Sequence, residues 1–281
     1  MGDRVDMQVL TRRLHIEQTS WLVRELAPPT ASDAPPAVFV PGLGSGEYLL
    51  PHACLLARSR TVFVPDLPGF GASRGPRRLR TVEQFADSLL ELTDGLADRP
   101  VDLVGNSFGT QVALGAATRQ PAAVRRLILI GPTFDRAART YPRMLARWLT
   151  VMPIEPPALG VSLLRSYAKS GVRTPATAFR AGMRDEPERT IATLAHPILL
   201  VRGTRDRIAP RAWLEELRQR AAAAEIAEVP RVAHTVDFAA PDRLVELTRQ
   251  FLDLPDDPTA AMPLTEGVGR RAALGRAARS G

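Results

Sequence analysis

The chain has 281 residues, of which 45% are hydrophobic and 24% are charged, and this composition is typical of a globular protein. No apolar stretch approaches the roughly 18 residues that a membrane-spanning helix needs, and residues 1–10 contain two acids and no apolar signal-peptide core. Cys54 is the single cysteine, which excludes an internal disulfide and a Cys-rich metal site. We therefore expect a cytoplasmic protein without a metal.

The formal net charge of +7 raises the question of nucleic-acid binding. Every basic residue except Lys169 is Arg, which indicates a compositional bias. A nucleic-acid binder concentrates its charge in a stripe with interleaved aromatic side chains. The nearest candidate, residues 74–80, has four Arg and no aromatic residue and is typical of a solvated loop. We expect a small-molecule substrate, with neither nucleic acid nor membrane as a partner.

The predicted elements alternate between short apolar runs and longer stretches of helical periodicity. Two alternating segments, around residues 14–16 and 21–23, come first and predict an antiparallel edge hairpin. Predicted strands then follow at residues 38–40, 61–64, 101–104, 127–130, 198–201 and 225–230. Nearly continuous apolar runs of this kind are typical of strands buried on both faces of a parallel sheet. Between them, Thr81 and Gln84 form the capping box of a helix, and the whole order predicts an α/β fold with ligands at the carboxyl ends of the strands.

The alternation is interrupted once, between residues 133 and 195. This region has helical patches but no convincing strand, and six prolines divide it into short helices. We expect it to form a helical cap over the site, with the core domain made of residues 1–132 and 196–254. Residues 255–281 are rich in Ala, Arg, Gly and Pro, and this composition predicts a disordered tail.

The motif Gly105-Asn106-Ser107-Phe108-Gly109 stands where a predicted strand ends and a helix begins near Thr110. This context fits the G-x-S-x-G elbow, a sharp turn that points the serine hydroxyl at the substrate. The alternative is a Gly-rich turn whose serine merely caps the helix. We expect Ser107 to be a nucleophile.

A serine hydroxyl needs a general base to become a nucleophile, and the chain has four histidines. His15 lies in the predicted hairpin, His52 in a helix, and His196 just before a strand. His234 differs, because it follows the last predicted strand and precedes the final helix. Its loop therefore starts at the sheet edge that carries Ser107. We expect His234 to be the base, and the alternative is a histidine of a surface loop.

A carboxylate must hold the imidazole in the right tautomer and stabilise the imidazolium. Asp206 comes just after the strand at 198–201, and it gives the chain order Ser, Asp, His that is typical of triads built on such a sheet. Asp66 also follows a strand. However, it opens a tight turn at residues 67–71, where a carboxylate more naturally caps local backbone. We therefore expect Asp206 to be the third member.

The oxyanion of a tetrahedral intermediate needs two N–H donors. One is expected from the backbone of Phe108, directly after the nucleophile. The other is expected from the Gly-rich loop after the strand at 38–40, where Leu43 is the candidate. This loop lacks the Lys and Ser/Thr of a P-loop and the spacing of a dinucleotide fingerprint, so a phosphate cradle is not expected.

Four of these motifs, together with the late histidine, resemble the α/β-hydrolase superfamily in order and spacing: Val40–Gly44, Asp66–Ser73, Gly105–Gly109 and Arg202–Asp206. The resemblance covers about residues 5–254. It implies a mostly parallel, eight-stranded sheet flanked by helices, a helical cap inserted after the sixth strand, and no cofactor. Asn106 and Phe108 look most like the hydrolases that cleave carbon–carbon bonds of ring-fission products. Those enzymes usually have Trp where this chain has Thr235.

Three functions remain open from the sequence. The first is hydrolysis of a small carboxylic ester through an acyl-enzyme, the second is cleavage of a carbon–carbon bond by the same residues, and the third is a non-hydrolytic or binding-only relative. The predicted cap carries nine Arg and one Lys against five acids, and this field would attract an anionic group on a substrate. The alternative is a solvated helical face in an Arg-biased protein.

Overall fold

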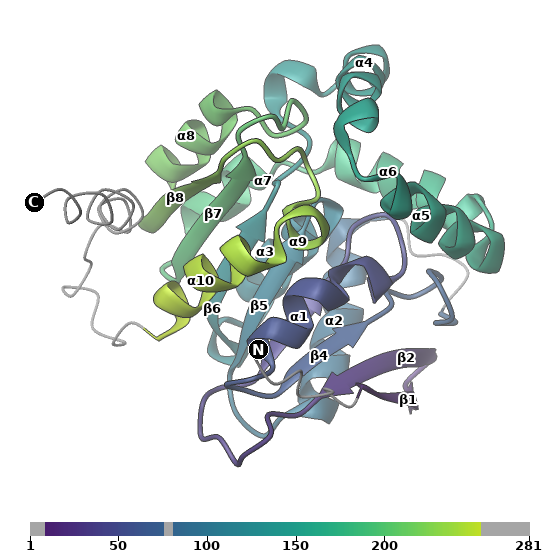
Figure 1. Ribbon diagram of the computed structural model, residues 1–281, viewed down its shortest axis with the longest axis vertical. Coiled ribbons are helices and arrows are strands. Elements are labelled where there is room, and N and C mark those ends of the chain that lie inside the picture. The colour runs from purple at the N-terminus through teal and green to yellow at the C-terminus, as the bar shows by residue number, and fades with distance from the viewer. Residues whose placement is uncertain (1–8, 76–80, 254–281) are drawn as a thin grey trace, which may run out of the picture.

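An eight-stranded sheet organises the chain, with the strand order β1-β2-β4-β3-β5-β6-β7-β8 (Figure 1). The computed structural model describes residues 9–75 and 81–253. The strands are β1 (Val9–Ile16), β2 (Thr19–Leu26), β3 (Ala37–Val40), β4 (Val62–Pro65), β5 (Val101–Asn106), β6 (Val124–Ile130), β7 (Pro197–Gly203) and β8 (Ala223–Val229). The β1–β2 and β2–β4 pairs are antiparallel, whereas β4, β3 and β5 to β8 pair in parallel. The predicted mostly parallel α/β fold, with its edge hairpin, is confirmed.

Helices cover both faces of this sheet. One face carries α1 (Leu50–Leu56) and α10 (Pro241–Leu252), and the other carries α2 (Val82–Leu96), α3 (Phe108–Arg119) and α8 (Arg211–Arg220). Successive residues of a central strand pack into different cores, so that Leu127 faces α3 and its neighbour Ile128 faces α1 and α10. Burial on both faces is the physical reason that the apolar runs in the sequence are continuous.

Two helix starts follow the local chemistry. The Thr81 hydroxyl accepts a hydrogen bond from the backbone N–H of Gln84 at 3.4 Å, as the capping motif predicts. α3 begins at Phe108, slightly before the start expected near Thr110. The reason is that the turn at Ser107 takes only one residue, so the helix follows Ser107 directly.

The segment between β6 and β7 is a helical insert, as predicted. Its main helices are α4 (Tyr141–Val151), α5 (Pro157–Ser170), α6 (Arg173–Arg184) and α7 (Pro187–Thr190). Proline stands in the first turn of α4, α5 and α7, where its missing N–H leaves no bond unmade. The boundaries of a separate cap at 133–195 stay a prediction, and the predicted tail at 255–281 lies outside the described residues.

Several shorter helices complete the chain: η1 (Gly46–Leu49), η2 (Pro121–Ala123), η3 (Arg136–Ala138), η4 (Met152–Ile154), η5 (Ile191–Thr193) and α9 (Val236–Ala239). Across residues 9–75 and 81–253, no helix combines the length and the apolar character that crossing a membrane requires.

The first turn of α3 lies directly against the ends of β3 and β5. A β-carbon at Gly109 would come within 2.0 Å of the Val40 carbonyl oxygen, and one at Gly105 would come within 2.6 Å of the Gly109 carbonyl oxygen. Backbone therefore touches backbone at this point, and a side chain on either glycine would force α3 away from the sheet.

We predict that Gly109→Ala destabilises the fold by about 3 kcal/mol or more, because backbone cannot give way as a flexible side chain can. Urea unfolding followed by circular dichroism measures the change. Gly160→Ala is the matched control, since a β-carbon there has no atom within 4 Å and the substitution should be neutral or stabilise α5 by up to about 1 kcal/mol. Equal stability of Gly109→Ala and the parent chain would contradict the close approach.

Candidate active site

Ser107 is held in a strained conformation between β5 and α3. Its φ of 55° and ψ of −122° lie outside the regions that non-glycine residues normally occupy. Such a residue costs on the order of 1–3 kcal/mol and persists only where the surroundings fix it. The Ser107 N–H donates to the Ile130 carbonyl at 2.9 Å, which ties the turn to β6. The turn places the Ser107 side chain at the carboxyl edge of the sheet.

The structure brings the three predicted side chains together at this edge. His234 Nδ1 lies 2.8 Å from Asp206 Oδ2. A carboxylate can only accept, so Nδ1 carries the proton, and Nε2 is the acceptor that faces Ser107 Oγ at 3.0 Å. The other Asp206 oxygen accepts from the N–H groups of Ile208 and Ala209 at 2.8 and 3.0 Å, so both oxygens are fixed in place.

The rejected candidate Asp66 has a different role. One of its oxygens accepts from the Gly46 N–H at 2.7 Å and from Arg24 at 2.9 Å. The second oxygen accepts from the Ala72 N–H at 2.9 Å. It therefore caps local backbone, as its position in a turn suggested.

The other histidines do not contact Ser107. His15 is exposed, and His196 lies against the Pro121 carbonyl. His52 is fully buried, with Nδ1 3.0 Å from Asp237 Oδ1 and Nε2 3.1 Å from the Thr248 hydroxyl. This buried pair was not expected from the sequence, and it joins α1 to α9 and α10.

Opposing influences set the protonation of His234. Burial alone lowers the pKa of the imidazole, because a charged ring loses its hydration. The Asp206 carboxylate, and behind it Glu155 and Asp237, outweigh burial and raise the pKa of His234 above its ordinary value. The neutral form that can take a proton from Ser107 is therefore favoured only above that raised pKa.

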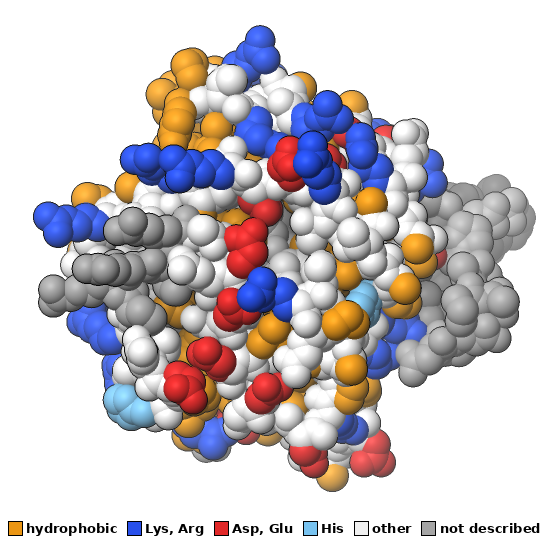
Figure 2. Space-filling model, turned by 180° about the vertical axis from the view of Figure 1, so that it is seen from behind, with side chains coloured by type: hydrophobic (Ala, Val, Ile, Leu, Met, Phe, Trp, Pro, Cys, Tyr) orange, Lys and Arg blue, Asp and Glu red, His pale blue; other side chains and the backbone are white. Residues whose placement is uncertain are grey.

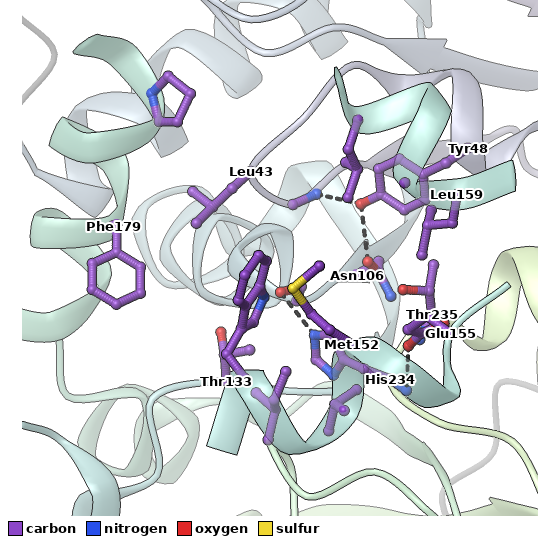
Figure 3. Close-up of a pocket in the computed structure, with 18 of the residues that line it drawn as sticks. Leu43, Tyr48, Asn106, Thr133, Met152, Glu155, Leu159, Phe179, His234 and Thr235 are labelled. Carbon is purple, nitrogen blue, oxygen red and sulfur yellow. Dashed lines mark hydrogen bonds between the residues drawn. The ribbon is translucent and has the colours of Figure 1, made fainter. Parts of the chain in front are cut away.

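Glu155 is a site residue that sequence reasoning missed. It lies in the link between η4 and α5, and its Oε1 accepts from the backbone N–H groups of His234 and Thr235 at 2.7 and 2.8 Å (Figure 3). Hydrogen bonds from the backbone of the loop that carries His234 thus tie this loop to the insert. The only sequence feature that could have drawn attention to Glu155 is that it is a lone acid among three prolines, Pro153, Pro156 and Pro157.

Gly131, at the end of β6, supports the imidazole from another side. Its φ is 57°, and a β-carbon there would lie 2.8 Å from His234 Cε1. Only glycine allows both this backbone conformation and this close approach.

Of the two predicted oxyanion donors, Phe108 directly follows Ser107, and Leu43 lines the same cavity as Ser107. The Gly42 N–H donates to the Tyr48 hydroxyl at 2.6 Å, and this hydroxyl donates to Asn106 Oδ1 at 2.9 Å (Figure 3). The Gly42 N–H therefore already has an acceptor, so it is not free to bind an oxyanion. In the part of the chain that the structure describes, no acceptor is bound to the N–H of Leu43 or of Phe108. Tyr48 thus connects the Gly-rich loop to Asn106, the residue before Ser107.

A cavity of about 670 Å³ opens above Ser107 and His234. Its volume is within the range of about 300–1,000 Å³ that small-molecule sites occupy. Residues of the insert form most of its wall, among them Met152 of η4, Leu159 of α5 and Phe179 of α6 (Figure 3). No Arg or Lys of the described residues lines it, and Glu155 is the carboxylate of its wall. Within the same residues, no group of three His, Cys, Asp or Glu side chains could hold a metal ion.

Some basic residues of the insert pair with acids that do not line the cavity. Arg139 pairs with Glu188 at 2.6 Å, and Arg147 pairs with Asp135 at 2.6 Å. Because no Arg or Lys of the described residues lines the cavity, the positive charge of the insert is not directed into it.

Comparisons with known proteins agree with this architecture. The model of the alpha/beta hydrolase family matches residues 37–247, and the chain belongs to this family. A 2-hydroxymuconate semialdehyde hydrolase from Pseudomonas sp. (strain CF600) is 44% identical over 77 residues, which is 27% of this chain and 27% of that protein. A 2-hydroxy-6-oxo-2,4-heptadienoate hydrolase from Pseudomonas putida is 39% identical over 104 residues, or 34% and 37% of the two chains.

The matched parts span only 27% and 37% of the lengths of these two relatives. Solved structures match over more of the chain. The enol-lactonase from Burkholderia xenovorans LB400 has a TM-score of 0.73 with 21% identity, and the match covers 86% of this chain and 99% of that one. At this identity the likeness concerns the fold.

We predict that Asp206→Asn lowers the pKa of His234, because the substitution removes the carboxylate charge that opposes the effect of burial. Glu155→Gln should lower it by less, since the charge of Glu155 raises the pKa of His234 less than Asp206 does. NMR titration of the His234 imidazole measures both shifts. An unchanged His234 titration in Asp206→Asn would contradict the assignment of the ion pair.

Proposed function

We propose that the chain is a serine hydrolase that cleaves a small carboxylic ester through a Ser-His-Asp triad. The observation that carries the proposal is the pair of contacts made by His234, 3.0 Å to Ser107 Oγ and 2.8 Å to Asp206 Oδ2. Nucleophile, base and orienting carboxylate in this relation define acyl-transfer chemistry. The family membership supports it.

The reaction follows from the positions of these groups. Ser107 Oγ attacks the acyl carbon while His234 Nε2 takes the hydroxyl proton. The carbonyl oxygen becomes an oxyanion, which the N–H groups of Leu43 and Phe108 stabilise. The imidazolium then gives its proton to the departing alkoxide, so an alcohol leaves and an acyl-enzyme remains. Water, deprotonated by the same imidazole, releases the acid and restores Ser107.

The cavity wall supports an uncharged, apolar acyl or alkyl group as the bound part of the substrate. A carboxylate in this cavity would lose hydration without meeting an Arg or Lys of the described wall, and burying such a charge unpaired is costly. This differs from the anionic substrate that the charge of the insert suggested. That suggestion remains untested, and the direction of Arg139 and Arg147 away from the cavity argues against it.

Carbon–carbon bond cleavage is the second candidate. It is favoured by the names of the two relatives from Pseudomonas, which are hydrolases of a hydroxymuconate semialdehyde and of a hydroxy-oxo-heptadienoate. Such keto-acids carry a carboxylate, for which the described cavity wall offers no cation. The third candidate is a non-hydrolytic relative. It would not need the strained conformation of Ser107 or the contact of Ser107 with His234.

We predict that Ser107→Ala lowers kcat for p-nitrophenyl esters by about 10⁴-fold or more, with the fold intact, because the nucleophile is lost. A fluorophosphonate probe should label the parent chain and the control Ser59→Ala but not Ser107→Ala. Labelling or activity in Ser107→Ala would refute the triad, and an unlabelled parent chain would favour the non-hydrolytic reading.

We further predict that kcat/KM is higher for p-nitrophenyl butyrate or hexanoate than for a succinate half-ester of the same length. The physical reason is the absence of a cation in the described cavity wall. A dienol keto-acid, assayed beside these esters, separates the two candidate reactions. Preferred turnover of the keto-acid would assign the chain to carbon–carbon cleavage and reject the ester proposal.

A further inference from the structure

Exposed apolar side chains are concentrated on the insert. Among the described residues, eleven large apolar side chains are exposed, and nine of them lie between residues 141 and 172. Exposed patches of this kind mark interaction surfaces when they are contiguous. Figure 2 shows hydrophobic side chains beside Lys and Arg side chains at its upper left, where α4 lies in this turned view.

α4 is the centre of this surface. Its apolar arc runs from Val151 through Trp148 to Leu149, but within this helix only Val151 and Met144 are buried. An amphipathic helix normally covers its whole apolar stripe. Much of the stripe of α4, including Leu145 and Trp148, is open to solvent.

Part of this exposure belongs to the cavity, and part does not. Leu145, Trp148 and Met152 line the cavity and are also exposed to solvent, so they lie at its mouth. Leu149 and Leu164 do not line it, yet they are 57% and 70% exposed. Neither the core nor the cavity explains why these two side chains are apolar.

The charge around this surface is positive. Residues 141–173 contain five basic residues and one acid, Glu155, which is turned toward His234. Arg165 follows Leu164, and Arg173 follows the exposed Val172. No described carboxylate pairs with Arg165 or Arg173. A second copy of the chain docked here about a two-fold axis would oppose like charges.

We propose that this face of the insert, formed by α4, η4 and α5, docks on the surface of a lipid aggregate that carries anionic headgroups. The apolar side chains enter the interface while the basic side chains meet the headgroups, as in interfacial amphipathic helices. The mouth of the cavity then faces the lipid. The sequence predicted no membrane partner because no segment spans a bilayer, but surface docking needs no span. Docking at this face is independent of the proposed hydrolysis.

The test uses the full chain carrying Ser107→Ala, so that no lipid is hydrolysed, and vesicles of phosphatidylcholine with or without phosphatidylglycerol. Trp148 is a built-in reporter, since it is 44% exposed whereas Trp21 and Trp213 are buried, and these are the chain's three Trp. We expect flotation with the anionic vesicles, a blue shift of Trp emission, and weaker binding at high salt.

Matched variants locate the surface. Leu149→Ser and Leu164→Ser should each weaken partitioning about tenfold or more, because a Leu side chain leaves the apolar interface. Leu10→Ser on β1, where the side chain is 56% exposed, should bind as before. Arg165→Glu should weaken binding, whereas Arg58→Glu should not. Turnover of a soluble ester should be unchanged by Leu149→Ser and Leu164→Ser in the chain that keeps Ser107.

Several results would overturn the proposal. One is the absence of both flotation and a blue shift with anionic vesicles. Another is equal binding to neutral and anionic vesicles, and a third is an equal loss of vesicle binding in Leu10→Ser and Leu149→Ser. A dimer in solution that Leu149→Ser dissociates would assign the face to a second copy instead. If the parent chain hydrolyses no soluble ester but the protein still binds anionic vesicles, the proposed reaction is rejected and the docking surface stands.

Discussion

The one-residue turn at Ser107 is the constraint on which the site depends. β5 ends at Asn106 and α3 begins at Phe108, so Ser107 must take the left-handed φ of 55° between them. This turn is possible because Gly105 and Gly109 let the helix lie against the strand ends. The hydroxyl and the N–H of Phe108 consequently lie at the same edge of the sheet. Parallel β7 and β8 deliver Asp206 and His234 to that edge.

Two carboxylates then hold the imidazole in different ways. Asp206 binds the ring at Nδ1, whereas Glu155 binds the backbone of its loop. Asp206 is buried and Glu155 is half-buried, which costs both acids hydration. Hydrogen bonds from the N–H groups of Ile208 and Ala209 offset part of that cost for Asp206. The cavity beside them is largely apolar, which strengthens the electrostatic interactions at its polar end.

Strands and triad geometry could be predicted from the sequence because each has a local signature. Burial on both faces leaves continuous apolar runs, and the carboxyl ends of parallel strands place Ser107, Asp206 and His234 at one edge. Glu155 could not be found in this way, since its partners lie 79 and 80 residues further along the chain and its Pro-rich link has no periodicity. The positive charge of the insert is evident from the sequence, but the direction of its side chains is not. Arg147, for example, turns to Asp135 and away from the cavity.

The two hydrogen bonds that Glu155 accepts from the loop of His234 limit how far the insert can be exchanged as a separate module. In a chimera whose donor segment has no acid at this position, the backbone N–H groups of residues 234 and 235 would be left without the acceptor they have here. Such a graft would disturb the base even where the transplanted helices pack well and form a suitable cavity. A chimera of this kind therefore requires the insert and the histidine loop to be transferred together.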